Sequence, residues 1–248
     1  MKQRSHHLQS KRTMQFIEVL RSMWFALVAP HRIVETISTP VTAFFAVAVV
    51  VSTMVSLSAS YIEDGQPALR AENAAFERMS LAKDTTSAGA QVVDLSPPAR
   101  TFTAVLGGAL IKNIMPIVVL AGVFLSLVRF MTNAPLKFGA ALSIVSASTS
   151  ILCLELLLNT ALHVILGTNR AGIHAGVFVD PSAHGFLFLF LQNLAPLSLW
   201  RYVVIASAMA QASGLHPRYG VVLGPTVWAV VVLAMGLLSF NGFLFYGL

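Results

Sequence analysis

The 248-residue chain is 56% hydrophobic and only 10% charged, and its mean hydropathy is +0.76. Because soluble domains carry about a quarter charged residues, this composition excludes an ordinary soluble fold and favours a surface that faces lipid. The net charge of +6 is concentrated before the first long apolar run. Beside a membrane span, positive charge of this kind binds anionic lipid and sets the orientation of the chain in the membrane. We therefore expect no nucleic-acid partner.

Residues 1–40 form a basic segment that we assign to the cytoplasm. Its basic residues are Lys2, Arg4, Lys11, Arg12, Arg21 and Arg32. From Gln15 to Val28, apolar residues recur at three- and four-residue spacing, which predicts an amphipathic helix too short and too polar to span. The apolar stripe consists of Phe16, Leu20, Met23, Trp24 and Leu27. We expect this helix to end at Pro30 and to lie on the membrane surface, where the segment would contact anionic lipid.

Residues 41–248 predict an all-α bundle of about five transmembrane helices, since a span needs about twenty apolar residues. The predicted spans are 41–61, 104–128, 138–166, 186–212 and 221–245. Residues 62–103 form a long polar loop, with a helical stretch expected from Pro67 to Ala82. The fourth span is interrupted by Gln192, Asn193, Pro196 and Arg201. We read it as one kinked span, with a location of Phe186–Leu191 at the membrane interface as the alternative.

Lys and Arg in the loops predict the orientation. With a cytoplasmic N-terminus, the inner segments hold more of these residues than the outer ones. The polar loop 62–103 and the C-terminus then lie outside. The sequence therefore predicts a multi-pass membrane protein with a cytoplasmic N-terminus.

A small set of polar residues falls inside the predicted spans, where an ion costs a few kcal/mol. The set is Lys112, Asn113, Glu155, Asn159, His163 and Arg201. Helical rise places Lys112, Glu155 and Arg201 at similar depths, and we expect an ion pair between Glu155 and Lys112. The cluster is either a structural contact that fixes helix register, or a proton relay, ion relay or anionic-substrate site.

No HExxH, GxSxG or phosphate-binding Gly-rich loop occurs, so we expect neither an enzyme nor a bound metal or cofactor. Small residues at two places favour close helix packing. They are Gly107, Gly108 and Ala109, and then Ala140, Ala141, Ser143, Ser146, Ala147 and Ser148.

Three stretches resemble the YIP1 family of five-span membrane proteins, in its bacterial branch. They are Phe25–Val34, with Pro30 after an aromatic-apolar run, Lys137–Ala141 at the third span's entry, and Leu194–Leu215. The resemblance implies a helical Yip1 domain with a cytosolic N-terminus. Eukaryotic relatives act in vesicle traffic and contact small GTPases, but their Asp-Leu-Tyr-Gly-Pro motif is absent here.

Two functions follow as alternatives. The first is a non-enzymatic scaffold or accessory factor in membrane organisation, trafficking or envelope processes, with the bilayer, other membrane proteins or a second copy of the chain as partners. The second is a transport component, a permease or efflux-associated subunit that uses Lys112, Glu155 and Arg201.

Overall fold

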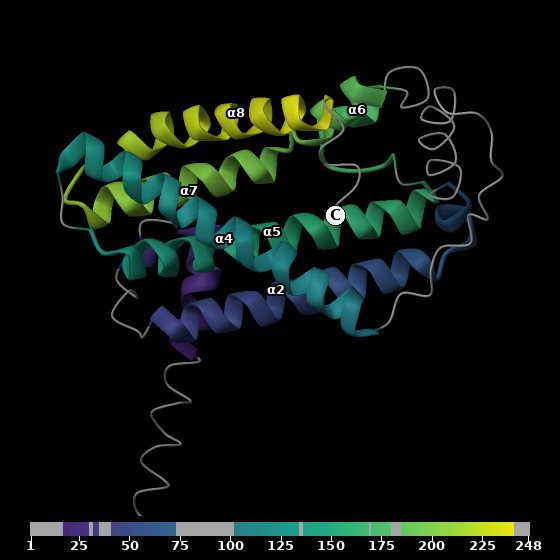
Figure 1. Ribbon diagram of the computed structural model, residues 1–248, viewed down its shortest axis with the longest axis horizontal. Helices are drawn as coiled ribbons and strands as arrows, with labels where there is room; N and C mark the ends of the chain where they lie inside the picture. The colour runs from purple at the N-terminus through teal and green to yellow at the C-terminus, as the bar shows by residue number, and fades with distance from the viewer. Residues whose placement is uncertain are drawn as a thin grey trace, which may run out of the picture.

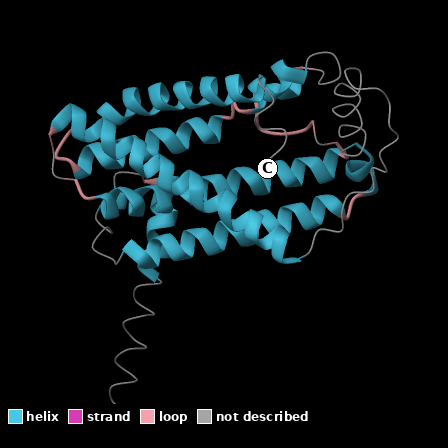
Figure 2. Cartoon of the chain, viewed as in Figure 1, coloured by secondary structure: helices cyan, strands magenta, loops and turns pink. Residues whose placement is uncertain are grey.

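The computed structural model describes residues 17–29, 32–34, 41–72, 102–133, 136–168, 170–179 and 185–240. These residues are all helical or loop, with no strand among them (Figure 2). Three helices, α2 (Val41–Asp64), α4 (Phe102–Thr132) and α5 (Phe138–Leu166), are long and apolar enough to cross a membrane. The prediction of an all-α membrane protein is confirmed at this level.

The fourth predicted span is broken rather than kinked. It consists of α6 (Gly185–Gln192) and α7 (Pro196–Ala212), which Asn193, Leu194 and Ala195 separate. Pro196 begins α7, where its missing N–H and fixed φ are tolerated. The break therefore comes from a helix start at proline and not from a bend within one helix.

The last long helix, α8 (Tyr219–Phe240), is apolar along its length and pairs with α7. Figure 1 shows α2 and α5 running in the same direction, with α4 crossing them and α7 reaching only about half as far along the bundle.

The predicted end of the last span, residues 241–245, lies outside the described residues, as do residues 73–101 of the predicted outer loop. Residues 67–72 are helical.

Helix α5 forms the centre of the bundle in its first half. Every side chain from Ser143 to Thr149 is buried, against α2, α4 and α7. Small residues permit this close approach, as the sequence predicted for α5. The same prediction is wrong for Gly107 and Gly108, because a Cβ at either position would meet no atom within 4 Å.

The N-terminal helix, residues 17–28, crosses the long helices near the ends where α2 and α5 begin (Figure 1, purple). Its buried face consists of Val19, Ser22, Met23 and Ala26, of which only Met23 belongs to the predicted apolar stripe. Leu20 and Trp24 of that stripe are exposed. The Ser150 hydroxyl on α5 donates a 2.9 Å hydrogen bond to the Met23 carbonyl. Residues 32–34 form a short 3-10 turn after this helix.

Candidate functional site

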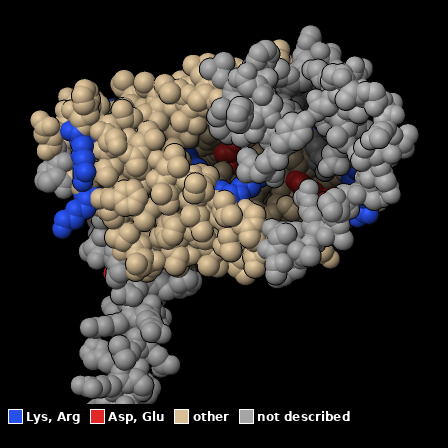
Figure 3. All heavy atoms as spheres, in the orientation of Figure 1, with Lys and Arg blue, Asp and Glu red and all other residues tan. Residues whose placement is uncertain are grey.

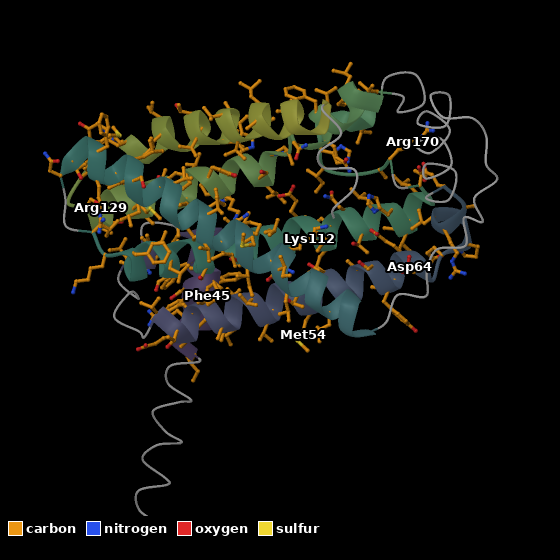
Figure 4. All side chains as sticks on the ribbon, in the orientation of Figure 1. Phe45, Met54, Asp64, Lys112, Arg129 and Arg170 are labelled. Atoms are coloured by element: carbon orange, nitrogen blue, oxygen red, sulfur yellow. The ribbon has the colours of Figure 1, made fainter. Side chains whose placement is uncertain are left out.

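The predicted polar cluster divides into separate contacts. Asn113 on α4 donates hydrogen bonds to the Ala109 carbonyl at 2.8 Å and to Ser56 of α2 at 3.5 Å. Lys112, labelled in Figure 4, is exposed on α4 and forms no ion pair with Glu155. The predicted Glu155–Lys112 pair is therefore wrong. Successive residues of a helix point about 100° apart. Lys112 therefore lies on the exposed side of α4 although Asn113, the next residue, is buried.

One polar contact joins the far ends of α2 and α5, and an ion pair joins the segments that follow these helices. His163 Nδ1 lies 2.7 Å from Glu63 Oε1, and Thr160 donates a 3.4 Å hydrogen bond to the same oxygen. Arg170 Nε lies 3.3 Å from Glu72, which also accepts bonds from the Thr168 hydroxyl. Figure 4 places Asp64 and Arg170 at this end of the molecule. His163 thus joins the end of α5 to the end of α2.

The segment after α5 folds back over the same helix. Asn159 accepts a 2.8 Å hydrogen bond from the Ile173 N–H, and the Ala175 N–H donates to the Leu194 carbonyl at the break before α7. His174 is buried beside this contact, and burial lowers the pKa of its imidazole, with a smaller contribution from His163. One backbone hydrogen bond therefore ties this segment to the break in the fourth span.

Arg201 lies in the second turn of α7 and is only 6% exposed. Its Nε donates a 3.4 Å hydrogen bond to the Ser148 hydroxyl of α5, whereas its Nη2 atom meets no hydrogen-bond partner. A buried donor left without a partner costs about 1–3 kcal/mol, more when it is charged. Arg201 thus keeps a buried guanidinium nitrogen without a hydrogen-bond partner.

Glu155 is the acid that interacts electrostatically with Arg201. It lies seven residues beyond Ser148, two turns along the same face of α5, and is partly exposed. Among the described residues it makes no ion pair, so the two charges attract each other without touching. Figure 3 shows blue and red side chains in a hollow near the middle of the molecule, at the place where Figure 4 labels Lys112.

The sequence identified Arg201 and Glu155 but missed Ser148, which positions Arg201, and Glu63, which pairs with His163. Glu63 and His163 both fall at the predicted outer ends of their spans, and this shared depth is the signal that would have indicated their pairing. Ser148 was noted only as a small packing residue. No group of three or more potential metal ligands occurs in the part of the chain that the structure describes.

Fold and site together define a helical membrane protein with a buried arginine beside a broken helix. Comparisons with models of protein families, with curated proteins and with solved structures found no match to this chain.

Proposed function

We propose that this protein is a five-span, non-enzymatic scaffold or accessory factor of a bacterial inner membrane, as its resemblance to the YIP1 family suggests. Helices α2, α4 and α5 supply three of the spans, and α8, with 22 residues, is about 33 Å long. The broken pair α6 and α7 supplies the remaining span. Exposed apolar side chains on α4 and α8 support contact with lipid; among them are Ile111, Met115, Val119, Val222, Val230 and Leu233.

The observation that carries a lipid-organising role is a pair of arginines on one aromatic ring. Arg21 and Arg32 lie 5.2 and 5.8 Å from the centre of the Phe25 ring, and both are exposed. Beside them, the N-terminal helix has an exposed apolar stripe of Ile17, Leu20, Trp24 and Val28. Apolar side chains that enter the acyl region beside guanidinium groups at headgroup level favour binding of anionic lipid.

Removing both charges tests this role. We expect the double variant Arg21→Gln with Arg32→Gln to retain less phosphatidylglycerol or cardiolipin on purification than the wild type, because each basic residue contributes about 1 kcal/mol at an anionic surface. Native mass spectrometry of the full chain measures the retained lipid. The matched control, Lys137→Gln with Arg218→Gln, removes two exposed charges from the same end of the bundle. Equal loss in both double variants would refute a specific site on the N-terminal helix.

The five-span topology predicts a labelling pattern for single cysteines in a Cys153→Ser background. Positions 71 and 178 should react with an impermeant thiol reagent from outside, and positions 133 and 216 only from the cytoplasm. All four are exposed. Cytoplasmic labelling at 71 would reverse the orientation, and external labelling at 216 with internal labelling at 133 would show that α6 and α7 do not cross.

The transport alternative is favoured by one specific feature. Broken helices near the middle of a membrane are where transporters bind their substrates, at the ends of half-helices. Here α7 begins beside a buried arginine and a nearby acid, Arg201 and Glu155. A transport component would use this site, and not the Lys112 side chain that the sequence had included.

A further inference from the structure

The loop after α5, residues 170–179, lies folded against the second half of that helix, and we call it the strap. Two backbone hydrogen bonds hold it, from residues two positions apart. The Ile173 N–H donates to the Asn159 side-chain oxygen on α5 at 2.8 Å, and the Ala175 N–H donates to the Leu194 carbonyl at 3.2 Å. The strap is therefore attached both to α5 and to the break before α7.

His174 lies between these two bonds and is only 8% exposed. Its ring fills the space beside the Gly172 backbone. A Cβ on Gly172 would lie 2.4 Å from the ring Nε2 and 3.3 Å from the Asn159 side-chain oxygen. Only glycine at position 172 leaves this room, so the strap closes on α5 with the imidazole inside it.

The charged groups around His174 come from three elements. Of the described titratable groups, His163 on α5 is the one that acts on His174 electrostatically, and it lies 2.7 Å from Glu63 of α2. The charged side chain of the strap is Arg170, which pairs with Glu72 at 3.3 Å. The 3-10 helix η2 (Ala175–Phe178), α6 and the break before α7 contain no titratable side chain. Both carboxylates thus have a basic partner other than His174.

Burial disfavours the charged imidazolium, and His163 adds to this effect, so the pKa of His174 lies below its ordinary value of 6.5. A released strap returns the ring to water, where the ring recovers its ordinary pKa. Protonation therefore favours the released strap. Closure is fully stable above about pH 6.5 and weakens as the pH falls below that value.

We propose that protonation of His174 releases the strap from α5 and from the break before α7, which makes this end of the bundle sensitive to acid. Release breaks the hydrogen bonds that Asn159 and Leu194 accept from the strap, so the break is no longer tied to the end of α5. This inference goes beyond the lipid-binding role and uses no step of it. In the proposed topology the strap faces the outside, so it would respond to the external pH.

Hydrogen exchange of the purified full chain in detergent, followed by mass spectrometry, measures the release. We expect the protection of the strap amides, those of Ile173 and Ala175 included, to fall about 5–30-fold between pH 7.5 and pH 5.0, after correction for the intrinsic exchange rates. Each pH unit below the ordinary pKa favours the protonated ring up to about tenfold. Residues 143–149 of α5 should stay protected, which separates release from unfolding. Unchanged protection of the strap at pH 5.0, or an equal loss in α5, overturns the proposal.

Two substitutions assign the change to His174. Because His174→Gln cannot be protonated, its strap should be equally protected at both pH values. His216→Gln, at an exposed histidine between α7 and α8, should behave as the wild type. An acid-induced loss in His174→Gln as large as in the wild type overturns the proposal. Should His174→Gln leave the strap unprotected at pH 7.5, exchange of the carbon-bound hydrogen of the wild-type ring gives the titration midpoint of His174, and a midpoint at the ordinary value or higher overturns it instead.

Discussion

Replacing Gly224 by alanine should destabilise the protein by about 3 kcal/mol or more, because α7 and α8 would be forced apart. A Cβ at position 224 would lie 2.6 Å from the Val203 Cα, 2.7 Å from its backbone nitrogen and 2.8 Å from the Tyr202 carbonyl oxygen. All three are backbone atoms, which cannot move aside as a flexible side chain can. Gly220, one turn earlier, contacts Ser207 in the same way. These glycines form the small-residue seam that lets two membrane helices approach closely.

The matched control is Gly122→Ala on α4. A Cβ there would meet no atom within 4 Å, so the change only removes the helix-breaking tendency of glycine. We expect it to be neutral or to stabilise by up to about 1 kcal/mol. Titration with a denaturing detergent, followed by the reactivity of Cys153, measures both variants. Equal stability of the two would show that α7 and α8 are not in this close contact.

Replacing Phe124 by alanine should cost about 3–5 kcal/mol through the cavity that it leaves. Phe124 on α4 is fully buried, and its ring centre lies 6.0 Å from that of Tyr202 on α7. Tyr202 is next to Arg201, so this contact also supports the turn of α7 that carries Arg201. Lipid is as apolar as the inside of the bundle. The cost in a membrane therefore comes from lost packing contacts and not from lost hydrophobic burial.

Phe130→Ala on the same helix is the control, because its side chain is 89% exposed. We expect a change within about 0.5 kcal/mol there. Phe124→Leu should lie between the two alanine variants, since it restores part of the volume. The same titration compares all three. A cost at position 130 equal to that at position 124 would contradict the assignment of α4's buried face.

The break in the fourth span shows how a sequence pattern was read correctly and interpreted wrongly. Gln192, Asn193 and Pro196 were visible as interruptions, and we took them for a kink in one helix. A proline inside a helix and a proline that begins one have the same local sequence signal. The difference lies in the contact between Ala175 and Leu194, which joins residues nineteen positions apart and leaves no periodic pattern.

The sequence by itself determined the helical membrane class and the bounds of α5, because long apolar runs without charges leave a chain few alternatives to helices in lipid. It also predicted similar depths for Lys112, Glu155 and Arg201, since helical rise is constant. Only the tertiary structure decided what these side chains contact, because depth says nothing about rotation round the helix axis. Asn113 on α4 bonds to Ser56 of α2, Lys112 beside it is exposed, and Arg201 on α7 bonds to Ser148 of α5.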